Sequence, residues 1–171
     1  MKTIFKWSLA VVTVGLLAYN LFPEQELTPG TAIDRLIVYK SERKLLAYAD
    51  NQLVKTYTIS LGRKPDGRKE FEGDRRTPEG TYTINDKNPN SAYHKNLGIS
   101  YPSADDIAHA KKLGKPVGGA IKIHGLRNGT SVIGKLHRWA DWTQGCIAVT
   151  NDEISELYEA VAVGTPIEIH P

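Results

Sequence analysis

Two residues of this sequence, Cys146 and His124, are of the types that catalyse acyl transfer through a covalent intermediate. A free thiol has a pKa of about 8.5, and a neighbouring imidazole can convert it into a thiolate that attacks an amide carbonyl. The acyl group then passes to water or to a second amine, while histidine protonates the leaving amine. We therefore expect Cys146 to be the nucleophile and His124 the base, and we expect Cys146 to alkylate at about pH 6 to 7 faster than free cysteine.

His124 lies in an alternating run that ends at Gly125. Ile121 and Ile123 point to one face of the expected strand, whereas Lys122 and His124 point to the other. Gly125 lets the backbone turn and leaves its carbonyl approachable. His124 is therefore expected at a strand end on the polar side, where a histidine taken alone is more often hydrogen-bonded than catalytic.

Cys146 lies in a glycine-cysteine step shortly before a predicted helix that starts at Thr150. Backbone N–H groups near such a turn point at an oxyanion, and a thiolate gains from the positive partial charge there. Taken alone, a free cysteine is equally well explained as a small buried hydrophobe. The candidates for substrate or oxyanion contact around this turn are Trp142, Thr143, Gln144, Gly145, His137, Arg127 and Arg138.

The segment before the turn holds other side chains that suit a site. His137 is a candidate second base or substrate contact, with a solvated loop histidine as the favoured alternative. Asp141 either orients a histidine or begins a turn, and Trp139 either lines a groove or belongs to the core. These residue types also bind zinc, but their spacing matches no zinc motif, so we expect no metal and no cofactor.

Length and composition indicate one globular domain. The chain has 171 residues, of which 40% are hydrophobic and 24% charged, so it can bury a core. Its net charge of +3 without a basic cluster argues against nucleic acid as a partner. A single cysteine excludes an intramolecular disulfide framework and a thiolate zinc cage. We expect a monomer.

The N-terminal residues have the character of an export signal. Lys2 and Lys6 precede an apolar stretch at residues 7–22. That length fits either a cleaved signal peptide or an uncleaved membrane anchor, and the absence of a clear cleavage triplet favours the anchor. The positive-inside rule places the remainder outside the cytoplasm, in the periplasm or cell envelope. A buried N-terminal helix of a soluble protein is the alternative.

The rest of the chain is predicted to be mainly β with two helices, an α+β fold. Residues 1–22 form the signal or anchor, residues 23–32 a tether, and residues 33–171 the domain. The expected strands are residues 35–41, 44–49 and 53–61 as a meander, then 81–85 and 166–169. The expected helices are residues 104–113 and a helix from Thr150, each preceded by a capping pair. Residues 62–80 form a long functional or mobile loop.

Two separate segments resemble a known family. The IHG at residues 123–125, followed by T-x-G-C-I at residues 143–147, resembles the catalytic signature of YkuD-type L,D-transpeptidase domains. GDRRTPEGTYTI at residues 73–84 resembles the upstream Thr-Pro-x-Gly segment of that family. The resemblance covers residues 33–169 and implies a β-rich sandwich or mixed-sheet fold. It implies that the cysteine attacks a bond next to diaminopimelate in a peptidoglycan stem peptide.

By this resemblance Cys146 is the nucleophile, His124 the base, and Gly125 the residue whose carbonyl orients the imidazole. Many members carry a histidine two residues before the cysteine and an arginine or asparagine two after it, whereas this chain has Gln144 and Ala148. Glutamine can hydrogen-bond but cannot titrate. Without the arginine, the candidates to hold a substrate carboxylate are Arg127, Arg138, Arg75 and Arg76.

The direction of the reaction stays open between three alternatives. The first is an L,D-transpeptidase. The second is a hydrolase, because DWTQGCIAVTN at residues 141–151 also resembles a branch that includes amidases detaching lipoprotein from peptidoglycan; an L,D-carboxypeptidase belongs to the same class. The third is a non-catalytic wall-binding module, which Gln144 and Ala148 favour and the retained cysteine and histidine disfavour.

Overall fold

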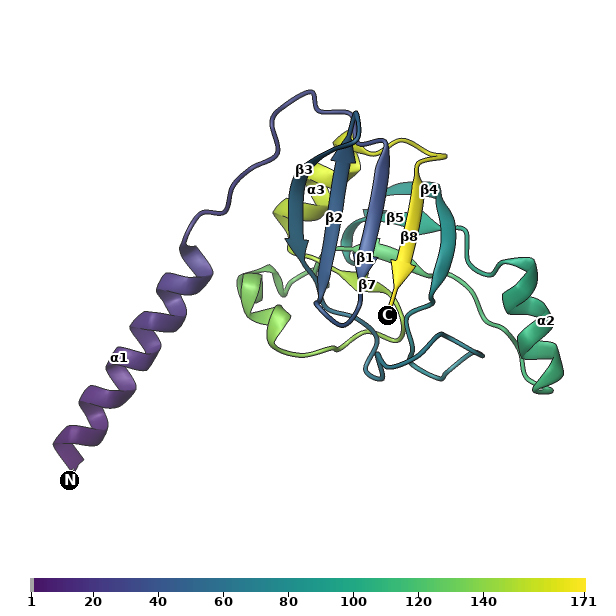
Figure 1. The fold of residues 1–171 in the computed structure, drawn as a ribbon. Coiled ribbons are helices and arrows are strands. Elements are labelled where there is room, and N and C mark those ends of the chain that lie inside the picture. Colours follow the sequence, from purple (N-terminus) through teal and green to yellow (C-terminus); the bar gives the residue numbers. More distant parts are fainter. Residues whose placement is uncertain (1) are drawn as a thin grey trace.

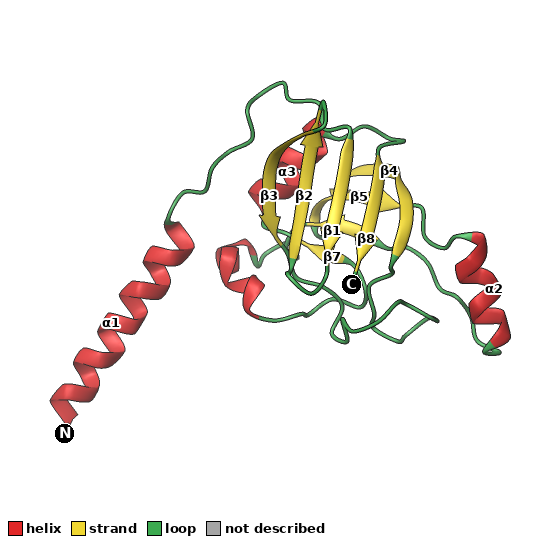
Figure 2. Cartoon of the chain, viewed as in Figure 1, coloured by secondary structure: helices red, strands yellow, loops and turns green. Residues whose placement is uncertain are grey.

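Within residues 2–171, which the computed structural model describes with side chains from residue 12 onward, eight strands form one mixed sheet (Figures 1 and 2). The strands are β1 (Arg35–Tyr39), β2 (Lys44–Ala49), β3 (Gln52–Thr58), β4 (Gly80–Ser91), β5 (His94–Ile99), β6 (Lys122–His124), β7 (Ile147–Ala148) and β8 (Pro166–His170). The helices are α1 (Lys2–Leu21), α2 (Ala104–Lys112), α3 (Asn151–Ala160) and a 3-10 helix, η1 (Ser131–Trp139). The sheet order is β3-β2-β1-β8-β4-β5-β6-β7.

The predicted meander and last strand are confirmed. β1, β2 and β3 pair antiparallel in succession, and β8 returns parallel to β1. Asp50 and Asn51 form the turn between β2 and β3 with φ angles of 50° and 62°. Short polar side chains tolerate this left-handed conformation better than other residues do.

β4 joins the two halves of the sheet. Its first residues, 80–83, pair with β8, and its later residues pair with β5 after a register shift near Ile84. The sheet therefore curls, and β5 lies behind β1 and β8 in Figure 1. The prediction of a strand over residues 81–85 was too short, and β5 was not predicted. Residues 86–96 are polar and lack alternation, so only backbone pairing with the neighbouring strand makes them extended.

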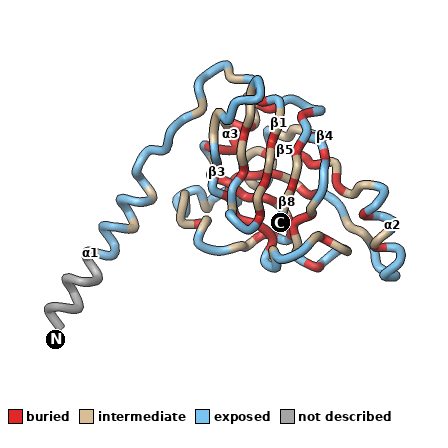
Figure 3. Tube along the Cα trace, in the orientation of Figure 1, coloured by how far each residue is buried: buried red, intermediate tan, exposed pale blue. Residues whose placement is uncertain are grey.

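Both predicted helices are present with their capping boxes. Ser103 and Asp106 exchange side chain and backbone hydrogen bonds at the start of α2, and Thr150 and Glu153 do the same for α3. α3 packs behind the sheet through residues such as Leu157, which is fully buried (Figure 3). α2 projects away from the sheet (Figure 1). The 3-10 helix η1 was not predicted.

Residues 62–80 are a long loop, as predicted, which an internal ion pair braces and which Lys40, the residue after β1, joins to the domain. Lys69 and Asp74 form a 2.7 Å pair in which both side chains are 4% exposed. The Lys40 ammonium donates to the carbonyls of Gly67 and Thr77. These buried charge-assisted contacts stabilise the path of the loop.

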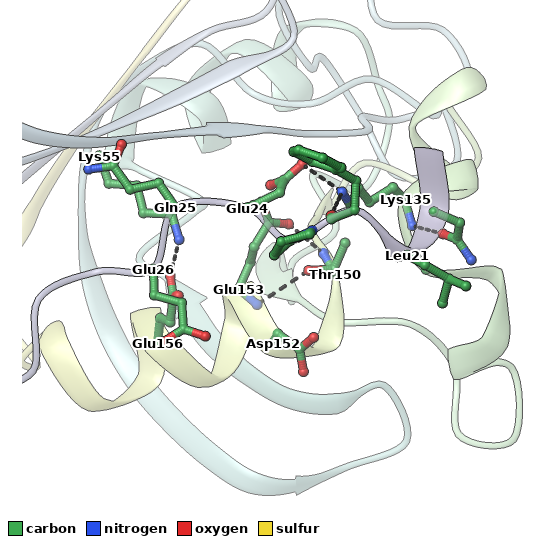
Figure 4. Close-up of a pocket in the computed structure, with 14 residues that line it drawn as sticks. Leu21, Glu24, Gln25, Glu26, Lys55, Lys135, Thr150, Asp152, Glu153 and Glu156 are labelled. Carbon is green, nitrogen blue, oxygen red and sulfur yellow. Dashed lines mark hydrogen bonds and ion pairs between the residues drawn. The ribbon is translucent and has the colours of Figure 1, made fainter. Parts of the chain in front are cut away.

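The segment that follows α1 also contacts the domain. Glu24 accepts two hydrogen bonds from Arg138, which in turn pairs with Glu153 at 2.7 Å. These contacts lower the pKa of Glu24 to about 2 against the effect of burial. A pocket of about 290 Å³ lies between this segment and α3, and Figure 4 shows Glu24 and Glu153 in it. Among the described residues, no helix combines the length and apolar character needed to cross a membrane.

Candidate active site

His124 and Cys146 are brought together by two parallel strands. β6 and β7 pair with Ile123 opposite Ile147 and His124 opposite Ala148. Ile123 and Ile147 are fully buried in the core, so Lys122, His124 and Cys146 occupy the opposite face of the sheet. From the strand spacing and rise, the Cα atoms of the histidine and cysteine are roughly 8 Å apart on one face, a diagonal that an imidazole can bridge.

These side chains line one pocket of about 490 Å³. Of the residues predicted for substrate contact, the pocket contains Trp142, Thr143, Gln144 and Arg127. It also contains residues that were not predicted: Arg63, Ser91, Tyr93, Asn96, Ala120 and Lys122. Tyr93 and Asn96 were missed because they lie on or beside β5, a strand that the sequence pattern did not reveal.

The imidazole of His124 is held in a defined orientation. Its Nδ1 lies 2.7 Å from the carbonyl oxygen of Gly125, so Nδ1 carries the proton and Nε2 keeps its lone pair. The ring lies 4.6 Å from the Tyr93 ring and 5.6 Å from the Trp142 ring, centroid to centroid. Burial lowers the pKa of His124, although the Gly125 carbonyl opposes this effect. Burial therefore favours the neutral form of this histidine.

The thiol of Cys146 is half-buried and lies 3.6 Å from the Ala120 carbonyl oxygen. Burial raises its pKa, and the Lys122 backbone N–H and the charges of Lys122 and Lys69 only partly offset this. This direction is opposite to the one that the expectation of fast alkylation at about pH 6 to 7 requires. Sequence reasoning supplied the neighbouring base but not the desolvation, so the resting pair is a neutral thiol beside a neutral imidazole.

The turn that carries Cys146 is fixed by Thr143. The Thr143 hydroxyl accepts from the Gly145 N–H at 3.0 Å and donates to the Cys146 carbonyl at 2.7 Å. Gly145 has a φ of 133°, and a Cβ there would lie 2.7 Å from the Arg76 carbonyl oxygen. Only glycine fits, because residues 62–80 pass directly behind the turn. This supporting role of the loop was not predicted.

Three of the four arginine candidates, Arg75, Arg76 and Arg138, lie outside the pocket. Arg138 was predicted to contact substrate, but its side chain is 5% exposed and binds Glu24 and Glu153. Arg76 pairs with Glu70 at 2.6 Å. Arg138 lies in the last turn of η1, which is kinked at Gly134, and its side chain pairs with Glu153 of α3.

His137, Asp141 and Trp139 do not line the pocket either. His137 is 6% exposed rather than solvated, its Nδ1 lies 3.1 Å from the Ser60 hydroxyl, and burial lowers its pKa to about 4. Asp141 accepts hydrogen bonds from the Arg43 side chain and from the backbone N–H of Leu61, so it fastens the segment before Cys146 to the residues after β3. Trp139 is 63% exposed. Among the residues that the structure describes, no group of three His, Cys, Asp or Glu side chains is placed to hold a metal ion.

Comparison with known proteins shows to which family the chain is similar. Residues 33–169 match the family described as the L,D-transpeptidase catalytic domain, YkuD. The "Putative L,D-transpeptidase YafK" of Escherichia coli K12 is 31% identical over 147 residues, which cover 78% of this chain and 52% of that protein. The "Putative L,D-transpeptidase YqjB" of Bacillus subtilis 168 is 31% identical over 138 residues, covering 78% of this chain and 69% of that protein.

Solved structures have the same fold. The helical cell shape determining protein Pgp2 of Campylobacter jejuni superposes with a TM-score of 0.61 at 25% identity, over 82% of this chain and 48% of that one. L,D-transpeptidase 1 of Mycobacterium tuberculosis gives a TM-score of 0.51 at 17% identity, over 83% of this chain and 63% of that one, and supports the fold alone. This chain spans about half the length of YafK and of Pgp2. By its sequence match and its curled mixed sheet, the chain belongs to the YkuD family of L,D-transpeptidase catalytic domains.

Proposed function

We propose that the protein is an extracytoplasmic cysteine acyltransferase that acts on peptidoglycan stem peptides. The observation that carries this proposal is the position of His124 and Cys146 on one face of adjacent parallel strands, lining one pocket. Family membership supports a cell-wall substrate. The Pgp2 relative, named as a determinant of helical cell shape, supports the same compartment. We include in the proposal a catalytic domain at residues 33–171, preceded by a tether and an N-terminal signal or anchor.

In the proposed reaction, the Nε2 atom of His124 removes the thiol proton as the Cys146 sulfur bonds to the carbonyl carbon of the donor peptide. The resulting oxyanion collapses, the C–N bond breaks, and the imidazolium gives its proton to the leaving amine. The acceptor amine then attacks the thioester and loses a proton to Nε2. A new amide forms, and the departing sulfur regains a proton from the imidazolium.

The hydrogen bond at Gly125 serves both half-reactions. Because Nδ1–H already donates to the Gly125 carbonyl, Nε2 is the nitrogen left to exchange protons with sulfur and with the amines. The carbonyl oxygen also stabilises the positive charge that the ring acquires after each proton transfer. Proton transfer from a neutral thiol thus occurs together with attack, and no resting ion pair is needed.

The test uses the full chain with purified peptidoglycan, with and without an amine acceptor, and weighs the products by mass spectrometry. We expect cross-linked peptides from the wild type and none from Cys146→Ser or His124→Gln. His170→Gln is the matched control, because His170 is partly exposed on β8, pairs with Glu168 and does not line the pocket. Only trimmed peptides would indicate the hydrolase, and released lipoprotein the amidase. Unchanged peptidoglycan with a folded wild type would refute the enzyme and favour a binding module.

A further inference from the structure

Lys122 is the cationic residue that the strand geometry sets beside the cysteine. It lies two residues before His124 on β6, and therefore projects to the same face. Extending the β6–β7 register by one residue places Lys122 opposite Cys146. Both residues line the pocket. A positive charge at this position is adjacent to the atoms that react.

The Lys122 ammonium keeps spare donor capacity. Its contacts among the described residues are a 3.4 Å hydrogen bond to the Asn96 side-chain oxygen and a 3.9 Å ion pair with Asp86. Both distances are long for a charge-assisted contact, and the Asp86 side chain is 58% exposed. An ammonium group has three donors, so a ligand anion can be bound without breaking a strong internal pair.

The other cations of the pocket are less suited to this task. Arg127 is exposed and lies on the loop after β6 rather than on a strand. Arg63 is also exposed, and its Nε donates to the Trp142 carbonyl at 3.2 Å. Lys122 is 31% exposed at its side chain and rises from a strand whose neighbours are core residues. Rigid elements hold a binding group more precisely than loops do.

We propose that the Lys122 ammonium binds a substrate carboxylate adjacent to the scissile bond, a role for which the sequence analysis considered only arginines. The inference rests on the proposed function, since it names the group of the stem peptide that this site recognises. The side-chain oxygen of buried Asn96 lies 3.4 Å from the Lys122 ammonium, on the same side of the pocket. The charge of Lys122 also acts on the thiol, whose pKa it lowers. One residue thus positions the donor peptide and favours ionisation of the nucleophile.

The binding experiment uses a synthetic stem tetrapeptide in three forms: with the carboxylates on both sides of the scissile bond free, or with one or the other amidated. Calorimetry measures their binding to three full-length proteins that all carry Cys146→Ala. The first retains Lys122, the second adds Lys122→Met, and the third adds the conservative Lys122→Arg. We expect Lys122→Met to weaken binding of the free peptide about tenfold, which is about 1.4 kcal/mol. One of the two amidated peptides lacks the carboxylate that Lys122 binds, and its affinity should be the same with Lys122 retained and with Lys122→Met. Lys122→Arg should restore most of the affinity for the free peptide.

Lys44→Met is the matched control, because Lys44 is an exposed strand lysine paired with Glu42 away from the pocket. Kinetics with Cys146 intact separate the two proposals: Lys122→Met should raise KM for the free peptide about tenfold and change kcat less. Lysine-dependent binding without turnover would refute the acyltransferase and retain the carboxylate site. If the enzyme turns over, but the three peptides bind with equal affinity both with Lys122 retained and with Lys122→Met, the carboxylate site alone is refuted. Absence of peptide binding would overturn both.

Discussion

Removal of the Thr143 hydroxyl tests most directly whether Thr143 holds the turn that carries Cys146. Thr143→Val preserves the shape of the side chain and deletes the oxygen that accepts from Gly145 and donates to the carbonyl of Cys146. Thr143 is 4% exposed, so solvent cannot readily replace these bonds. Each buried polar group left without a partner costs about 1–3 kcal/mol. With partial relaxation, we expect a loss of about 2–4 kcal/mol in the free energy of unfolding.

Guanidinium denaturation of the full chain measures this loss as a lower midpoint at an unchanged m-value. Thr58→Val is the matched control, since Thr58 is exposed on β3 and should change stability by less than about 0.5 kcal/mol. Because the turn positions the sulfur, kcat on stem peptides should fall at least about tenfold. A Thr143→Val protein as stable and as active as the control would show that Thr143 does not hold the turn.

Three further results are expected. Alkylation of Cys146 by iodoacetamide should be slower than that of free cysteine at pH 7 and should rise with a midpoint above the usual thiol range, because burial raises the thiol pKa; a midpoint below about pH 8 would contradict this. Burial lowers the pKa of His137 to about 4 from 6.5, so this residue is neutral in the folded protein. Its contribution to the free energy of unfolding therefore falls as pH drops from 6.5 to 4, by at most about 3 kcal/mol. His137→Gln should make the denaturation midpoint depend less on pH over that interval. Arg138→Met should cost about 3 kcal/mol because it leaves buried Glu153 unpaired, whereas Glu24→Gln, which removes a 40% exposed partner, should cost less than about 1 kcal/mol; equal losses in thermal unfolding would refute this ordering.

The structure also changes how the pair His124 and Cys146 is understood. A cysteine beside a histidine is often activated as a thiolate and imidazolium, and the residue types alone favour that state. Here the ring is 6% exposed and packs against Tyr93 and Trp142, so the charged form of the ring is disfavoured. This favours the proposed reaction, in which proton transfer to the oriented Nε2 atom accompanies substrate attack.

Local signals in the sequence were sufficient for much of the fold. The capping pairs at Ser103 and Thr150 depend on residues three apart, so both helix starts could be predicted. The turn at Asp50 and Asn51 is likewise a local property of the backbone. The alternation before Gly125 placed His124 at a strand end, because side-chain direction in a strand has a period of two.

What depends on contacts between distant segments was decided only by tertiary structure. Whether Arg138 reaches the pocket or pairs with Glu153 depends on the path of η1, which no local pattern encodes. The cation beside the thiol is Lys122, and it became visible only through the register between β6 and β7. The protonation state of Cys146 follows from burial, which is a property of the assembled core rather than of residue type. The sequence thus determined which groups are candidates to react, and the packing of the strands determined their burial and their neighbours.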